Sequence, residues 1–185
     1  MMHVLQPFVR PGLRVLDAGC GSGFFSKYFL SMGCEVTALD YSDGALEIVR
    51  KRTEGKCKAY LKEDLLDPEW GRKHALQFDL IFTDGLFEHF DVQDQQRILG
   101  HLKEAKTREG LIATFVPNRF SWWEIVRPLV MPGIHEEPFT PDALRRMHGE
   151  FTLIRSGGLN VLPFVLSPES LFGDTLGMIL YCIAR

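Results

Sequence analysis

Long apolar runs and an excess of positive charge are both missing from this 185-residue sequence. No stretch approaches the roughly 20 apolar residues that a membrane-spanning helix needs. Residues 1–12 have neither the basic start nor the apolar centre of a signal peptide. The formal net charge of -3 argues against a general nucleic-acid binder, whose surface should be basic. We therefore expect a cytoplasmic protein without a membrane span and without a nucleic-acid partner.

Cysteine is scarce, and its spacing argues against two kinds of site. The four cysteines are Cys20, Cys34, Cys57 and Cys182, and no two of them form a C-x-x-C pair. This spacing suggests neither a zinc site nor a dithiol redox motif. We expect free, buried thiols in a reducing compartment.

Short apolar runs alternate with amphipathic segments as far as residue 117. Strands are predicted at 14–18, 35–40, 57–61, 79–83 and 111–116. Helices are predicted at 22–32, 44–53 and 92–106. The alternation predicts an α/β fold, with a parallel sheet covered by helices on both faces. The length suffices for one domain with a substantial core, and no linker divides residues 1–185.

The pattern changes after Pro117. Residues 118–138 are rich in Trp, Pro and Gly, with one helix predicted near 122–130. Thr140 and Pro141 are typical of the start of a helix. Strands are predicted at 151–155 and 176–184, and residues 157–173 are interpreted as a long connection between them.

A glycine-rich turn follows the first predicted strand, in the sequence VLDAGCGSG at residues 15–23. Glycine at 19, 21 and 23 lets a ligand lie against the backbone, because no Cβ stands in the way. Free N–H groups at the following helix start favour electron-rich ligand atoms. Asp17 adds a negative charge beside the turn.

Acidic residues follow the next predicted strands as well: Asp40, Asp64 and Asp84. Ligands of open α/β sheets bind where the carboxyl ends of the strands meet. A carboxylate at Asp40 can accept both hydroxyls of a ribose, and one at Asp64 can accept from the exocyclic amine of a base. These residues predict a nucleotide-type site.

Two features argue against a dinucleotide at this turn. Phe24 occupies the third glycine position of the G-x-G-x-x-G fingerprint, and Asp17 would repel a pyrophosphate. S-adenosylmethionine carries a ribose, an adenine, an ammonium and a sulfonium, and these groups suit the acids at 17, 40 and 64. An NAD-dependent oxidoreductase remains as a less favoured alternative.

The chain resembles the class I S-adenosylmethionine-dependent methyltransferases. The resemblance is carried by VLDAGCGSG, by ALDYS at 38–42, by EDLL at 63–66 and by FDLIFTDGLFEHF at 78–90. It implies a Rossmann-like, seven-stranded, mostly parallel sheet whose last strand is antiparallel and lies between the fifth and sixth. It also implies that residues 1–118 form a cofactor-binding half and residues 119–185 a substrate-side half.

The resemblance implies cofactor contacts for a set of residues. These are Asp17, Gly19, Cys20, Gly21, Gly23, Asp40, Tyr41, Asp64, Leu65, Asp84 and Gly85. Tyr41 would pack on the adenine, and Asp64 with the backbone of Leu65 would read the adenine edge. Asp17 would face the amino end of the methionine part. As alternatives, Tyr41 is a surface turn residue and Cys20 only a small residue in a tight turn.

Glu88 and His89 are the candidate catalytic residues. They follow the fourth predicted strand, where a histidine can act as a general base. A structural or substrate-lining role is the alternative. The aromatic stripe at Phe24, Phe25 and Phe29 is interpreted as core, with one ring in contact with substrate as the alternative.

Substrate-lining residues are predicted in the segment after Pro117: Trp122, Trp123 and His135. They favour a small-molecule substrate with an apolar or aromatic part. The sequences PGIH at 132–135 and FTP at 139–141 are similar to those of the ubiquinone-biosynthesis O-methyltransferases. Those enzymes carry Glu-x-x-Glu-His after the fourth strand, associated with a divalent ion, whereas Gly85 replaces the first acid here. We predict no metal site.

The sequence thus predicts S-adenosylmethionine-dependent methyl transfer to an oxygen, nitrogen or carbon atom of a small molecule. A regulatory or scaffold protein that binds the cofactor without catalysis is the alternative. The acceptor and the oligomeric state stay open, with a homodimer as one option.

Overall fold

The computed structural model describes residues 1–122, 124, 137–160, 173 and 176–185. The chain forms two compact units, one of Met1–Asp84 with Gln96–Ile112 and one of Gly85–Gln95 with Ala113–Arg185. Most of the helix predicted near 122–130 lies outside the described residues. None of the helices in the described ranges is long and apolar enough to cross a membrane.

The strands form a seven-stranded sheet in the order β3-β2-β1-β4-β5-β7-β6. Their bounds are β1 Arg14–Ala18, β2 Glu35–Asp40, β3 Ala59–Lys62, β4 Phe78–Asp84, β5 Lys106–Pro117, β6 Leu153–Leu159 and β7 Ile179–Ala184. Strand β1 pairs in parallel with β2 and β4, and β2 pairs in parallel with β3. Strand β7 lies between β5 and β6 and pairs with β6 in antiparallel fashion, which confirms the predicted fold class.

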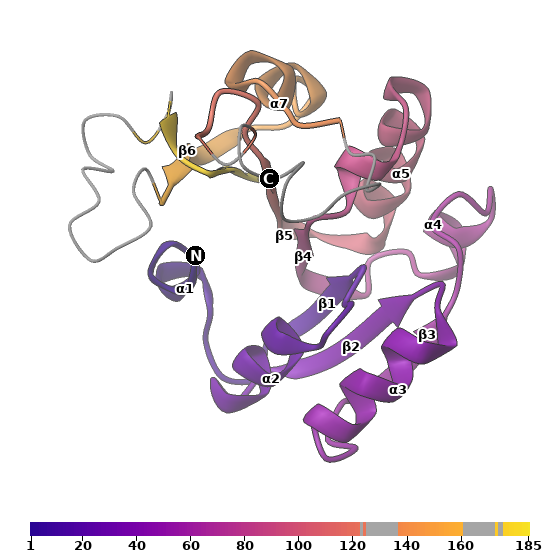
Figure 1. Cartoon of the computed structure of the whole chain (residues 1–185). Helices are drawn as coiled ribbons and strands as arrows, with labels where there is room; N and C mark the ends of the chain where they lie inside the picture. Colours follow the sequence, from indigo (N-terminus) through magenta and orange to yellow (C-terminus); the bar gives the residue numbers. More distant parts are fainter. Residues whose placement is uncertain (123, 125–136, 161–172, 174–175) are drawn as a thin grey trace. The chain divides into compact units, whose positions relative to one another are not determined.

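In the first unit, helices α2 (Phe24–Ser31) and α3 (Asp43–Arg52) both pack on β2 (Figure 1). Both are amphipathic, and they bury Phe29 of α2 and Leu46 and Val49 of α3. Ser42 caps α3 by accepting a hydrogen bond from the amide of Ala45 at 3.3 Å. Gly33, with φ 80°, follows the end of α2, so the chain turns sharply into β2.

Short helices in the first unit escape prediction because they lack a full amphipathic repeat. They are α1 (Met2–Leu5), the 3-10 helix η1 (Gln6–Phe8) and α4 (Trp70–Lys73). The longer α5 (Val92–Ala105), which runs from the second unit into the first, was predicted, and its inward-facing Ile98, Leu99 and Leu102 are buried. All four cysteines are free and buried, as predicted, whereas the reducing compartment stays a prediction.

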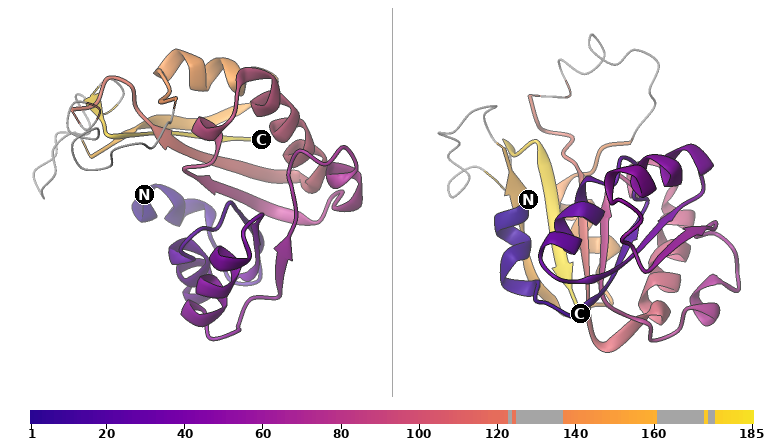
Figure 2. Two further views of the ribbon diagram at one scale, coloured as in Figure 1. Left: turned by 45° about the vertical axis from the view of Figure 1, so that its right-hand side comes forward. Right: turned by 90° about the horizontal axis from the view of Figure 1, so that it is seen from below.

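In the second unit, a 3-10 helix η2 (Phe87–His89) follows β4, and α7 (Pro141–Met147) begins after the predicted cap. The Thr140 hydroxyl accepts from the amide of Ala143 at 3.1 Å. Strands β6 and β7 run side by side (Figure 2).

The bounds of two strands in this unit, β6 and β7, differ from the prediction. Strand β6 covers 153–159 instead of 151–155, so the interpretation of 157–159 as connection was wrong. Gly157 and Gly158 suggested a loop, but a Cβ at Gly157 would come within 2.8 Å of the Tyr181 hydroxyl. The absence of a Cβ at Gly157 therefore leaves room for the Tyr181 ring. Strand β7 begins at Ile179 instead of 176.

Candidate cofactor site

The three glycines after β1 all have left-handed backbone conformations, with φ 72° at Gly19, 45° at Gly21 and 72° at Gly23. They serve different purposes. A Cβ at Gly23 would lie 2.9 Å from Val49, so this glycine allows α2 to approach α3. A Cβ at Gly21 would meet nothing closer than the Gly19 carbonyl at 3.9 Å. The backbone of Gly21 therefore faces open space in which a ligand can lie.

A cavity of about 270 Å³ opens beside this turn, near the carboxyl ends of β1 and β4. Its lining comprises Asp17, Gly19, Cys20, Gly21, Ser22, Phe24, Phe25, Phe82 and Asp84. Five of these residues were predicted as cofactor contacts, and the structure brings them together. Ser22, Phe24, Phe25 and Phe82 were not predicted as such, although the aromatic stripe at the start of α2 signalled two of the three rings.

Asp17 is the most deeply buried acid of the cavity, with 3% of its surface exposed. Burial raises the pKa of its carboxyl group to about 7, although a hydrogen bond from Ser26 Oγ at 2.6 Å opposes the shift. The nearby Asp84 raises it further by charge repulsion. Burial likewise raises the pKa of Asp84 itself to about 6. A cation in the cavity would favour the ionised form of both groups.

Asp40 ends β2 and supports the turn from the other side. Its Oδ2 accepts a hydrogen bond from the amide of Gly21, and its Oδ1 accepts one from the amide of Ser42, both at 3.0 Å. Each carboxylate oxygen can accept a second hydrogen bond. The side chain is thus held in place and can still bind two ribose hydroxyls.

The residues predicted to contact adenine lie on the loops after β2 and β3, which are parallel neighbours. Tyr41 is 80% exposed, and Asp64 is exposed and accepts from the amide of Leu66 at 2.9 Å. The carbonyl of Leu65 is hydrogen-bonded to His101 Nδ1 at 2.7 Å. None of these residues lines the cavity, so their roles stay predictions.

The candidate catalytic residues belong to the second unit. Glu88 is 4% exposed, and its Oε1 lies 3.3 Å from where a Cβ of Gly85 would be. Gly85 has φ 69°, and its amide donates to the carbonyl of Phe115 at 3.1 Å. His89 is exposed. Glu88 is thus buried close to Gly85, whereas His89 is exposed to solvent.

Of the predicted substrate-lining residues, Trp122 is half-buried. Trp123 and His135 lie outside the described residues. No group of three metal-ligating side chains occurs within the described ranges.

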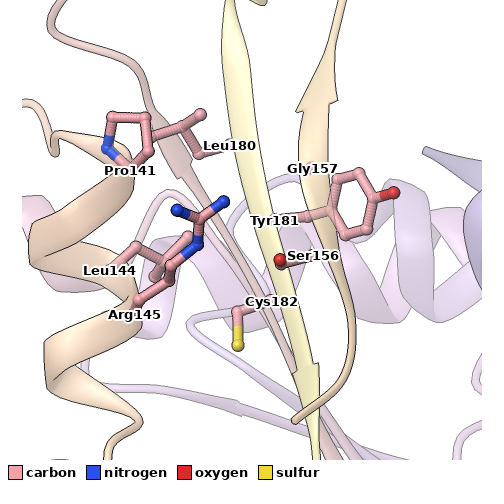
Figure 3. Close-up of a pocket in the computed structure, with 8 residues that line it drawn as sticks. All are labelled: Pro141, Leu144, Arg145, Ser156, Gly157, Leu180, Tyr181 and Cys182. Carbon is pink, nitrogen blue, oxygen red and sulfur yellow. The ribbon is translucent and has the colours of Figure 1, made fainter. Parts of the chain in front are cut away.

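A second hollow lies between α7, β6 and β7 (Figure 3). It is lined by Pro141, Leu144, Arg145, Ser156, Gly157, Leu180, Tyr181 and Cys182. Its volume of about 10 Å³ is that of a single water site, far too small for a nucleotide. Of these two hollows, the cavity beside Gly21 is the one with room for a nucleotide, and we take it as the candidate cofactor site.

The residues of this site fit S-adenosylmethionine. Open space over Gly21 leaves room for the cofactor against the turn. The carboxyl groups of the buried Asp17 and the half-buried Asp84 would be stabilised as carboxylates by its positive charges. Asp40, which holds the amide of Gly21, keeps acceptor capacity that a ribose could use.

The chain is similar to known methyltransferases in sequence. A family model described as a methyltransferase domain matches residues 15–110. A malonyl-[acyl-carrier protein] O-methyltransferase of Enterobacter lignolyticus is 41% identical over 149 residues, which cover 76% of this chain and 56% of that protein. A ubiquinone biosynthesis O-methyltransferase of Salmonella paratyphi A is 28% identical over 135 residues, with 68% and 54% covered. The chain spans about half the length of these two curated relatives.

Solved structures share the fold. A magnesium protoporphyrin IX methyltransferase from Synechocystis with bound S-adenosylhomocysteine matches with a TM-score of 0.70 and 16% identity. The match covers 98% of this chain and 78% of that one. Because the family model covers more than half of the sequence, the chain belongs to the class I S-adenosylmethionine-dependent methyltransferases, and its cofactor is S-adenosylmethionine.

Proposed function

We propose that the protein transfers a methyl group from S-adenosylmethionine to an oxygen atom of a small-molecule acceptor. Cofactor binding is supported by one observation above all. The cavity joins the open backbone of Gly21 to the buried Asp17 and the half-buried Asp84. The choice of oxygen is supported by the names of the curated relatives, which are O-methyltransferases. Dinucleotide binding has no comparable support.

In the proposed reaction the cofactor supplies a methyl group on a positively charged sulfur. Asp17 and Asp84 offset the charge of the bound cofactor, and Asp40 fixes its ribose while it holds the amide of Gly21 in place. Methyl transfer is an in-line displacement, so alignment of the acceptor and exclusion of water contribute most of the rate.

A hydroxyl acceptor must lose its proton during the transfer, whereas a carboxylate acceptor need not. We propose Glu88 and His89 as the residues that orient the acceptor or take up this proton. The segment 119–185 would then supply the substrate side, with Trp122, Trp123 and His135 as lining residues. An apolar or aromatic part of the acceptor would suit the two tryptophans.

We also propose a cytoplasmic location. The four free cysteines fit a reducing compartment. A homodimer remains an option for the assembly, and gel filtration with light scattering would determine it.

Turnover with a panel of acceptors tests the proposal. The purified protein is incubated with methyl-labelled S-adenosylmethionine and with phenols, carboxylic acids and amines, and labelled products are identified by mass spectrometry. Label transfer to phenols or carboxylic acids supports the proposal. Cofactor binding without transfer to any acceptor would support the alternative of a non-catalytic binding protein, and label on nitrogen alone would contradict the choice of oxygen.

A further inference from the structure

Three phenylalanine rings gather at the proposed cofactor cavity: Phe24, Phe25 and Phe82. The rings of Phe25 and Phe82 have centroids 4.5 Å apart, and those of Phe24 and Phe25 are 5.2 Å apart at an interplanar angle of 81°. Both α2 rings therefore belong to one aromatic cluster that continues to the cavity wall.

The three rings differ in burial. This difference distinguishes the ring that belongs to the core from the two that border the cavity. Phe82 is fully buried in β4, where packing alone explains an aromatic side chain. Phe24 is 50% exposed at the first position of α2, and Phe25 is half-buried. Because Phe24 leaves half of its surface in solvent, burial in the core does not explain it.

Two carboxyl groups, Asp17 and Asp84, share the cavity with these rings. Carboxylates attract a cation through their charge, and phenyl faces attract one through their quadrupole. Neither gains comparably from an uncharged group of the same size. A cavity lined by both kinds of group therefore discriminates by charge.

We propose that Phe24 and Phe25, together with the two acids, make this cavity selective for the charged sulfonium of S-adenosylmethionine over the neutral thioether of S-adenosylhomocysteine. This inference rests on the proposed function and adds a specificity role for the rings. Its consequence is that the two rings contribute more to the affinity for S-adenosylmethionine than to the affinity for S-adenosylhomocysteine.

The test is the ratio of two dissociation constants, measured by isothermal titration at pH 8. The probes are S-adenosylmethionine and S-adenosylhomocysteine, and the variants are Phe24→Leu and Phe25→Leu, which keep an apolar side chain but remove the ring. We expect the affinity for S-adenosylmethionine to fall by about 3- to 10-fold more than that for S-adenosylhomocysteine. Sinefungin, in which an ammonium-bearing carbon replaces the sulfonium, should follow S-adenosylmethionine.

Tyr28→Leu is the matched control. Tyr28 lies on the same helix, contacts the Phe25 ring at 6.4 Å between centroids and does not line the cavity. The Tyr28→Leu variant should leave the ratio of the two dissociation constants unchanged. Equal losses for both probes in the Phe24 and Phe25 variants would overturn the inference while leaving the proposed function intact. If the unaltered protein bound neither probe, the proposed function itself would fail.

Discussion

Cofactor binding should release protons, because the two acids of the cavity are partly protonated when it holds no cation. With a pKa of about 7 for Asp17 and about 6 for Asp84, the first is about three-quarters protonated at pH 6.5 and the second about one-quarter. If the bound cation ionises both groups, about one proton leaves per cofactor at this pH.

The assay is titration calorimetry of S-adenosylmethionine at pH 6.5 in two buffers with different ionisation enthalpies. The difference between the apparent binding enthalpies gives the number of protons released. Asp17→Asn removes the larger contributor and should reduce the release to about one-quarter of a proton. Asp67→Asn, which changes an exposed acid outside the cavity, should leave it at about one proton.

Proton release that is near zero in the unaltered protein, or equal in the unaltered protein and Asp17→Asn, would refute this reasoning. Either result would mean that the ligand does not lie against the Asp17 carboxyl. Loss of binding in Asp17→Asn is separated from misfolding by a thermal melt of the same sample.

Three further predictions concern the same unit. Because the pKa of Asp17 is raised in the folded protein, its contribution to the free energy of unfolding should decline by about 4 kcal/mol as the pH rises from about 4 to 7. Urea titrations at several pH values should therefore show that the free energy of unfolding of Asp17→Asn depends less on pH than that of the unaltered protein. Gly21→Ala should weaken the cofactor affinity measured by calorimetry at least tenfold, with a modest loss of stability. Gly23→Ala should instead destabilise the fold by about 1–3 kcal/mol, because its Cβ would clash with Val49. His101→Ala should weaken S-adenosylhomocysteine binding about 3- to 10-fold by freeing the loop after β3, and His101→Asn, which keeps a donor, should restore part of it.

The sequence predicted the parts of the fold that local physics determines. The bounds of β1 and β2 matched because each strand is a short apolar run that ends at an acid or a glycine turn. The cap at Thr140 was predicted from side-chain chemistry alone. The position of β7 between β5 and β6 came from the family resemblance, because strand order is not encoded in local patterns.

Other features depend on contacts between distant segments. Helix α4 has four residues, which is too short for an amphipathic repeat. Strand β6 includes two glycines that suggested a loop, and only the packing against Tyr181 explains Gly157. At the site, the sequence predicted Asp17, Gly19 and Gly21, which line the cavity. It indicated a core role for most of the Phe24, Phe25 and Phe29 stripe, because helical spacing does not reveal which ring borders a cavity.

The central claim is that the turn at Gly19–Gly23 binds S-adenosylmethionine with Asp40 on its ribose. Its most direct test is calorimetric titration of S-adenosylhomocysteine into the unaltered protein, Asp40→Ala and Asp43→Ala. Asp43 is an exposed acid three residues away that pairs with Lys62. We predict saturable binding at one site, a loss of tenfold or more for Asp40→Ala and little change for Asp43→Ala. Absence of binding to the unaltered protein, or equal affinities for all three proteins, would contradict the claim.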